Sequence, residues 1–253
     1  MTASPNEVEE HFGVTDVEAF PPRYNIAPTQ PILIIAGDVP RAPGDNRSPR
    51  RALLARWGLL PAWVKDPSTF PLLFNARSDT VAEKSSFRAA LRHRRVLVPA
   101  SGFYEWHRPP KETRQRPVPY WIRPRNGGLV AFAGLMETYM SPDGAEMDTA
   151  AIVTCAANAS ISSIHERMPV VIMPEDFERW LDCRAHEPRD VADLMTPAPD
   201  DYFEAIRVSD LVNKVANAGP ELQEPAPDEP QAPAGPKPKK REPGSDDGQM
   251  SLL

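Results

Sequence analysis

The chain has 253 residues, of which 41% are hydrophobic and 25% are charged, and its net charge is −6. This composition is typical of a soluble globular protein, and no apolar run is long enough to cross a bilayer or to act as a secretory signal. A net acidic chain argues against nucleic-acid binding by bulk charge. Two cysteines make no disulfide framework. We expect a cytoplasmic, nucleoid-associated protein with no membrane partner.

Two capping boxes mark the predicted starts of helices. Residues 4–7 (SPNE) place Pro5 at the first helical position and predict a helix through Phe12. Residues 80–83 (TVAE) predict a second helix that carries Phe87 and Leu91. Shorter helices are predicted around Ile161, at 174–181 and at 190–195.

Strands dominate the rest of the pattern, because apolar runs bounded by turn residues recur along the chain. Strands are predicted at 31–35, 52–60, 96–100, 103–107, 120–123, 129–138, 150–155, 170–173 and 203–208. With helices between and beside them, they predict an α+β fold. We expect one domain of mainly antiparallel strands with flanking helices over residues 1–218.

One predicted strand, at 103–107, carries a single carboxylate between aromatic residues. Alternation places Phe103 and Glu105 on one face of the strand, and Tyr104 and Trp106 on the other. A carboxylate beside an apolar ring is either a buried acid with a raised pKa or an exposed residue at the rim of a site. The strand pattern leaves both interpretations open.

Six short motifs follow one another along the chain. They are 24–29 (YNIAPT), 56–61 (RWGLLP), 75–78 (NARS), 102–106 (GFYEW), 154–158 (TCAAN) and 165–169 (HERMP). In this order they resemble the SRAP (SOS response-associated peptidase) family, the abasic site processing proteins. The resemblance covers roughly residues 3–222.

The resemblance implies a covalent trap for abasic sites in single-stranded DNA. The sequence contains no metal cluster, phosphate-cradling glycine loop or dinucleotide fingerprint, so we expect no cofactor and no metal. In the family, removal of the initiator Met exposes an N-terminal cysteine, and this self-processing is its peptidase activity. The α-amine of that cysteine forms a Schiff base with the aldehyde of the opened sugar, and its thiol then closes a thiazolidine ring. An α-amine with a pKa near 7.7–8.0 is partly neutral at pH 7, and the second bond forms within one molecule.

The resemblance also assigns the chemistry to particular residues. Asn75 is expected to hydrogen-bond the sugar or the new ring, while Glu105 and His165 transfer protons during ring opening and condensation. A buried structural amide is the alternative for Asn75, and a structural histidine is the alternative for His165.

DNA binding is expected from a second group of residues. Arg77 and the backbone near Thr154 are expected to hold phosphates, and Trp63 and Trp106 to stack on exposed bases. A structural ion pair is the alternative for Arg77, and core packing is the alternative for the tryptophans.

The chain departs from the family pattern at its first residues. The family opens Met-Cys-Gly-Arg, whereas this chain opens Met1-Thr2-Ala3-Ser4-Pro5, about seven residues further on. Either the start was assigned at an internal codon, or the cysteine has been lost and a DNA-binding shell remains. The retention of Asn75, Glu105 and His165 together favours the first explanation.

Three classes of function follow. The first is an abasic-site cross-linking enzyme with lyase-like chemistry, which acts as a monomer. The second is a noncovalent single-stranded DNA-binding protein with a degenerate site. The third is a peptidase that acts on other proteins, although no Ser-His-Asp or Cys-His pattern supports it.

Two stretches are locally basic and are candidates for phosphate binding despite the net acidity. They contain Arg88, Arg92, Arg94 and Arg95, and then Arg108, Lys111, Arg114, Arg116, Arg123 and Arg125. Solvated charged loops are the alternative.

The C-terminal part changes composition after residue 218. Residues 219–248 are rich in Pro, Glu, Asp and Lys, and so predict a disordered linker. Residues 249–253 (QMSLL) resemble the bacterial peptide that binds the replicative sliding clamp. Gln249 would be the polar anchor, and Leu252 with Leu253 the apolar plug.

Overall fold

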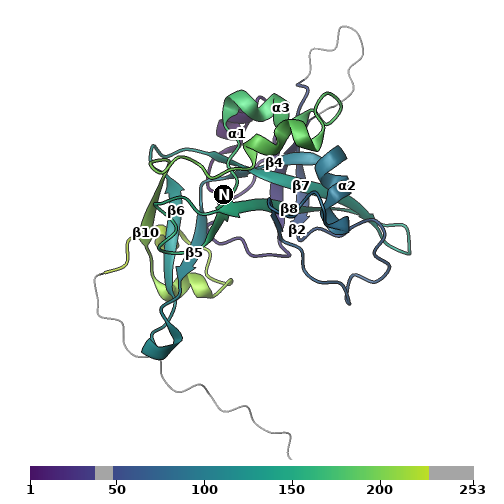
Figure 1. Ribbon diagram of the computed structural model, residues 1–253. Helices are drawn as coiled ribbons and strands as arrows, with labels where there is room; N and C mark the ends of the chain where they lie inside the picture. Colours follow the sequence, from purple (N-terminus) through teal and green to yellow (C-terminus); the bar gives the residue numbers. More distant parts are fainter. Residues whose placement is uncertain (38–47, 228–253) are drawn as a thin grey trace, which may run out of the picture.

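Two sheets form the framework of the protein, as the computed structural model shows for residues 1–37 and 48–227 (Figure 1). The larger sheet contains β1 (Pro31–Ala36), β2 (Arg51–Trp57), β3 (Asn75–Arg77), β4 (Arg95–Ala100), β7 (Val130–Met140), β8 (Glu146–Ala156) and β9 (Arg167–Pro169). The smaller contains β5 (Phe103–His107), β6 (Val118–Pro124) and β10 (Phe203–Arg207). This mixed, mainly antiparallel architecture confirms the predicted α+β class.

The larger sheet closes on itself. Its order is β2-β1-β4-β7-β8-β3, and β2 also pairs in parallel with β8 through Arg56 and Trp57. The strands β1, β2, β4, β7 and β8 therefore form a barrel whose core includes Ile34, Leu97 and Leu135, all without exposed surface. Closure leaves the C-terminal half of β8 free to pair with two further short strands.

The helices cover one side of this barrel. They are α1 (Pro5–Phe12), α2 (Ser85–His93) and α3 (Phe177–Leu181), with short 3-10 turns at Lys111–Thr113, Pro174–Asp176, Pro188–Leu194, Asp210–Asn213 and Pro220–Gln223. The helices α1 and α3 are neighbours in Figure 1. Phe12 of α1 stacks on Phe177 of α3 with ring centroids 5.4 Å apart. Trp180 of α3 is fully buried and donates from Nε1 to the Val96 carbonyl at 2.9 Å.

Arg95 does not belong to a basic surface, contrary to the sequence prediction. Its side chain is buried, and its guanidinium donates to the carbonyls of Leu91, Trp180, Asp182 and His186. These carbonyls satisfy the buried donors and tie β4 to the segment after α3. Arg92 and Arg94 of the same stretch pair with Glu187 and Glu137.

Helix starts were predicted correctly for α1 and wrongly for α2. In α1, Ser4 accepts from the Glu7 amide and Glu7 accepts from the Ser4 amide, as the capping box requires. In contrast, α2 begins at Ser85 without a side-chain cap, and the Thr80 carbonyl accepts from two following amides in a turn. The Thr80 hydroxyl is buried without a partner instead of capping a helix.

Two further predicted elements differ, and one strand of the structure was not predicted. Residues 159–164 form turns and not a helix. The strand predicted at 170–173 lies earlier in the chain, as β9 at Arg167–Pro169. Within 170–173, Val171 forms an isolated bridge with Phe132. β3 was not predicted at all.

The ordered domain extends beyond the predicted boundary at residue 218. Leu222 is fully buried, and Pro225 forms a bridge with Val208 of the segment after β10. The buried Leu222 and the backbone contacts of Pro225 and Ala226 hold this segment against the domain, although its composition predicted a linker. Residues 228–248 of that linker, and Gln249, Leu252 and Leu253 of the clamp-binding prediction, lie outside the described residues.

Within the described parts of the chain, none of the helices has both the length and the apolar character needed to cross a membrane.

Candidate functional site

The C-terminal half of β8 brings distant segments together. On one side it pairs in parallel with β3, with Asn75 opposite Ile152 and Arg77 opposite Thr154. Asn75 and Arg77 are exposed on the same face, because Ala76 between them is buried. Two predicted site residues therefore project from one short strand, beside Thr154.

On its other side β8 pairs with β9, which begins at Arg167, two residues after His165 and within the same motif. Ala156 lies opposite Arg167 in this antiparallel pair. The Arg167 guanidinium donates from Nη2 to the Thr154 carbonyl, so the side chain reaches back along β8 towards β3. Arg167 was not among the predicted site residues, although its place two residues after His165 was a signal for it.

Glu105 and His165 meet although they come from different parts of the fold. Glu105 Oε1 of β5 lies 3.8 Å from His165 Nδ1, and the two side chains keep 26% and 36% of their surface exposed. The backbone of Arg167 fixes the imidazole, because its amide nitrogen lies 3.1 Å and its carbonyl oxygen 3.0 Å from Nδ1. The pair therefore has one defined ring nitrogen facing the carboxylate.

Burial sets the chemistry of Glu105. Loss of solvent raises the pKa of this carboxyl, while His165, the Trp106 amide and Arg108 act in the opposite direction. Of the two interpretations of this carboxylate, the structure supports the partly buried acid. Such a group is suited to proton transfer at a pH closer to neutrality than an ordinary glutamate.

The two faces of β5 are arranged as predicted. Phe103, on the Glu105 face, packs edge-on against Phe132 and Phe203 with centroids 5.8 and 5.5 Å away. Tyr104 lies on the other face against Trp121 at 4.9 Å.

Trp106 shares the Tyr104 face and is therefore turned away from Glu105. Its indole packs in the cluster around Trp121 and donates from Nε1 to Asn213 Oδ1 at 2.8 Å. Of the two interpretations of Trp106, this geometry favours packing over base stacking. Adjacent residues in a strand point to opposite faces, which places the two side chains apart.

Trp63, in contrast, is available at the surface. It is 58% exposed and rests edge-on against Phe70 with centroids 5.5 Å apart. Phe70 lines an open pocket of about 240 Å³, together with Leu72 and Met147. Leu72 and Phe74 are also exposed, so apolar surface extends along the segment that leads to Asn75.

An acidic side chain joins the two arginines of the site. Asp79 lies 3.5 Å from Arg77 Nε and 3.1 Å from Arg167 Nη2. Its own backbone amide, and then Arg167 and Arg77, hold the pKa of this carboxyl below its usual value. Arg77 therefore has the ion pair named as its structural alternative, but the pair is exposed and open to competition from another anion.

The first residues of the chain lie beside the turn that opens β5. The Thr2 amide donates to Ser101 Oγ at 3.0 Å, and the Met1 amine donates to the Arg23 carbonyl at 2.7 Å. Ser101 is four residues before Glu105, so this end of the chain contacts the turn that leads into the strand with the carboxylate.

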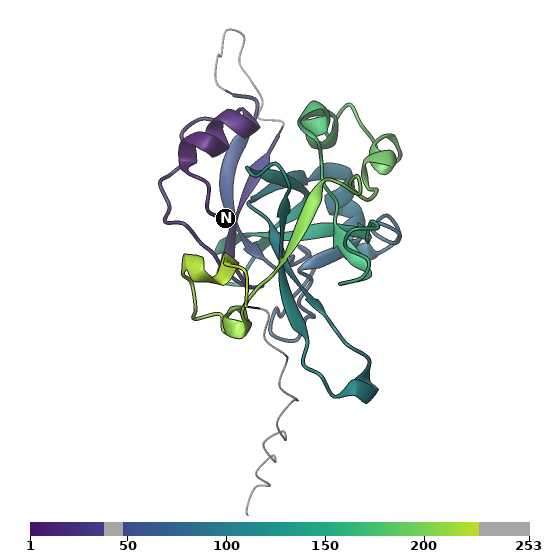
Figure 2. The same cartoon turned by 90° about the vertical axis from the view of Figure 1, so that its left-hand side faces the viewer.

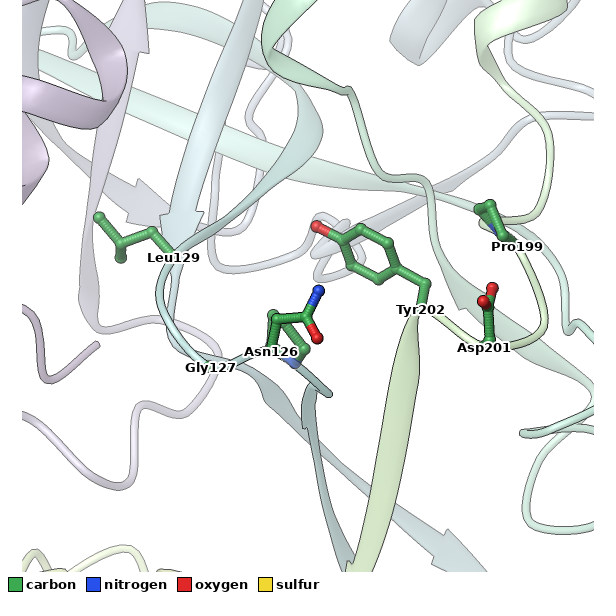
Figure 3. Close-up of a pocket in the computed structure, with 7 residues that line it drawn as sticks. Asn126, Gly127, Leu129, Pro199, Asp201 and Tyr202 are labelled. Carbon is green, nitrogen blue, oxygen red and sulfur yellow. The ribbon is translucent and has the colours of Figure 1, made fainter.

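Another hollow, of about 260 Å³, lies between the β6–β7 turn and the start of β10 (Figure 3). The Tyr202 ring projects over it towards Leu129, and burial raises the pKa of its phenol (Figure 3). None of the predicted site residues lines this hollow. Among the described residues, no three His, Cys, Asp or Glu side chains are placed to share a metal ion.

Comparisons with known proteins agree with the motifs. Residues 1–215 match the family model of the SOS response associated peptidase. The chain is 39% identical over 203 residues to the abasic site processing protein YoqW of Bacillus subtilis, covering 80% of this chain and 86% of that protein. It is 31% identical over 240 residues to the abasic site processing protein HMCES of Rattus norvegicus, covering 83% of this chain and 67% of that protein.

The fold is also found in a crystal structure from Bacteroides thetaiotaomicron. The two superpose with a TM-score of 0.70 at 24% identity, over 89% of this chain and 97% of the other. A match to the family model over nearly the whole described domain establishes the relationship, and the chain belongs to the SOS response associated peptidase (SRAP) family.

Proposed function

We propose that this protein processes abasic sites in single-stranded DNA by forming a covalent cross-link with them, and that it acts as a monomer. The observation that carries the proposal is the Glu105–His165 pair, 3.8 Å apart, at the end of the barrel where β8 also positions Asn75. The relatives named abasic site processing proteins support the same activity.

The proposed nucleophile is a cysteine that precedes Met1 in the functional protein. Its neutral α-amine attacks the aldehyde carbon of the opened sugar, and loss of one water gives a Schiff base. Its thiol then adds to the C=N bond, with the proton passing to the nitrogen, and closes a thiazolidine. Residues ahead of Met1 would extend from its amine, which lies on the Arg23 carbonyl, one residue before the contact of Thr2 with Ser101 at the start of β5.

Glu105 and His165 supply the proton transfers that these steps need. Glu105 accepts a proton from the amine or the thiol, and its raised pKa brings it closer to the working pH. His165 moves a proton to and from the sugar oxygen as the ring opens. Asn75, exposed on β3, hydrogen-bonds the sugar or the new ring.

Noncovalent binding positions the strand for this reaction. Arg77 and Arg167 hold a phosphate beside Thr154, and the exposed indole of Trp63 stacks on a base next to the lesion. The two arginines flank one carboxylate, so a phosphate that displaces Asp79 gains both of them.

The decisive experiment compares three proteins on abasic single-stranded DNA. They are the chain as given, the chain preceded by the family segment that begins Met-Cys-Gly-Arg, and the same segment with Ser in place of Cys. A band that resists denaturation is expected only with the cysteine, and intact mass spectrometry should show that its initiator Met has been removed. Salt-sensitive binding without a covalent band would favour the noncovalent alternative instead.

The genomic DNA gives an independent check. We expect the codons upstream of Met1 to encode, in frame, Met-Cys-Gly-Arg or a close variant. An in-frame stop codon immediately before Met1 would contradict this expectation.

We further propose that residues 249–253 bind the replicative sliding clamp. Gln249 supplies hydrogen bonds, and Leu252 with Leu253 an apolar plug, so micromolar affinity of about −8 kcal/mol is expected. Fluorescence polarisation of the last ten residues with the clamp tests this. Leu252→Ala with Leu253→Ala should abolish the signal, and an unchanged signal would refute the assignment.

A further inference from the structure

The connection between β5 and β6 forms an arm that extends away from both sheets (Figures 1 and 2). The two strands pair from Phe103↔Ile122 to His107↔Val118, and residues 108–117 form the end of the arm. Positions 112–117 are all exposed, so the end of the arm does not pack on the domain.

The arm is basic and its arginines are not neutralised. Arg108, Arg114 and Arg116 are exposed, and no ion pair within the described residues involves them. Other surface arginines do have acidic partners, as Arg92 has Glu187 and Arg123 has Glu204. On a protein with a net charge of −6, three unpaired arginines on one projecting segment form a distinct cationic surface.

The end of the arm is ordered by local interactions. Proline restricts the backbone at 109, 110 and 117, and Thr113 donates from its amide and its hydroxyl to the Pro110 carbonyl at 3.0 and 2.8 Å. Arg114 adopts a positive φ of 53°, which is uncommon for a side chain of this size. The backbone that carries the arginines is therefore held by local contacts before any partner binds, which lowers the entropic cost of binding.

The arm continues from the proposed site. β5 carries Glu105, and Arg108 is three residues further along, about 10 Å at 3.3 Å per residue. Arg108 is close enough to act electrostatically on the Glu105 carboxyl. A DNA strand bound over Glu105 needs only a few more nucleotides to reach Arg114 and Arg116.

We propose that the β5–β6 arm is a second phosphate-binding surface, which contacts the DNA backbone a few nucleotides away from the lesion. The proposal rests on the proposed function, because it assumes that DNA passes over Glu105. We assign the contact to phosphates and not to bases. Arginines on an exposed arm are attracted by the phosphate charge, and no groove orients their side chains towards base edges.

The test is the salt dependence of noncovalent binding to two intact DNA strands, of about 4 and about 30 nucleotides, the shorter one at the lower end of the usual site sizes. The variant Arg114→Gln with Arg116→Gln removes two charges from the arm and leaves Arg108, next to Glu105, unchanged. The control, Arg51→Gln with Arg189→Gln, removes two exposed arginines that lie outside both basic stretches.

On the long strand, the slope of log K against log salt should become shallower by about 1.4 for two lost contacts, and affinity near 0.1 M salt should fall by roughly tenfold. On the short strand both quantities should stay at the wild-type values, and the control should resemble the wild type on both. An unchanged slope on the long strand, an equal loss on the short strand, or an equal loss in the control would each overturn the proposal.

Failure of the proposed function has a separate readout. It appears as the absence of a denaturation-resistant band on abasic DNA, whereas the arm is measured on intact DNA without any covalent step.

Discussion

Glu105 acquires its chemistry from its surroundings rather than from its residue type. The strand that carries it points Phe103 into the core on the same face, so the carboxylate emerges at the edge of an apolar layer. Burial raises its pKa, and the neighbouring imidazole of His165 limits that rise. The same pair would be an ordinary surface contact if both side chains were fully hydrated.

Removal of either member of this pair should slow the reaction without changing binding. With the N-terminal cysteine present, Glu105→Gln and His165→Ala should each slow cross-linking by about 10 to 10⁴-fold. Both variants should bind intact single-stranded DNA as the wild type does. Single-turnover rates measure the first effect, and cross-linking by Glu105→Gln at the wild-type rate would show that this carboxylate has no part in the reaction.

The pH dependence follows from the direction of the shift. Because the pKa of Glu105 is raised, the carboxylate takes up its proton at a higher pH than an ordinary glutamate. When the pH is lowered, the cross-linking rate of the wild type should therefore begin to fall at a higher pH than the titration range of an ordinary glutamate. The residual rate of Glu105→Gln should lack this contribution and keep only the fall that protonation of the α-amine causes.

Two variants beside the site should change DNA affinity in opposite directions. Arg77→Ala removes a phosphate ligand, so binding should weaken and the salt slope should become shallower by about 0.7. Asp79→Asn frees Arg77 and Arg167 from a competing carboxylate and should strengthen binding by roughly two- to fivefold, the range for an exposed pair. Fluorescence anisotropy at several salt concentrations measures both, and weaker binding by Asp79→Asn would mean that the carboxylate orders the arginines instead.

At the scale of elements, the turn between β4 and β5 determines where Glu105 lies. Gly102 has φ +155°, and a Cβ atom there would lie 2.3 Å from the Ile122 carbonyl oxygen of β6. Any side chain would push β5 away from β6. The close approach of the two strands therefore depends on glycine at this position.

Gly102→Ala should lower the free energy of unfolding by about 2–4 kcal/mol, since both the backbone conformation and the contact are unfavourable. Gly127→Ala is the matched control, because φ is +73° there but no atom lies within 4 Å of the added Cβ. It should cost only about 1–2 kcal/mol of backbone strain. Urea denaturation measures both, and equal losses would show that the contact with β6 does not matter.

The sequence pattern predicted the elements that form through interactions between residues close together in the chain. The capping box of α1, the face alternation of β5 and most strands of the barrel follow from adjacent residues. β3 has three residues and no apolar periodicity, and it forms because β8 offers it a pairing edge 77 residues later in the register Asn75↔Ile152. Propensity does not encode such long-range pairing.

The candidate site also has a part that could be predicted from the sequence and a part that could not. The residue types at 75, 105 and 165 came from the family resemblance, whereas their arrangement required the fold. Arg167 and Asp79 were missed because their importance lies in a contact across two strands that the sequence separates. Trp106 was expected at the site because it neighbours Glu105 along the chain, but neighbours in a strand face opposite ways.

At the scale of the whole molecule, the N-terminal and C-terminal segments of the domain hold each other in place. The Asn25 side chain lies in the 24–29 motif and donates from Nδ2 towards the carbonyls of Val212, Lys214 and Asn217 at 3.1, 3.3 and 3.2 Å. Next to it, Tyr104 of β5 donates to the Tyr24 carbonyl at 2.9 Å. The motif therefore connects the small sheet to the last ordered turns of the domain, a structural task that explains why it accompanies the site motifs.

Asn25→Ala should loosen this connection. Loss of the shared hydrogen bonds should lower the free energy of unfolding by about 1–2 kcal/mol, and amides of residues 210–217 should exchange faster than those of β8. Asn126→Ala, at an exposed asparagine in the β6–β7 turn, is the control and should change neither quantity. Asn25→Asp should be worse than Asn25→Ala, because an acceptor-only carboxylate would face three carbonyl oxygens. If hydrogen exchange at 210–217 is the same in all three variants, the segment is held by the packing of Val212 and Leu222 alone.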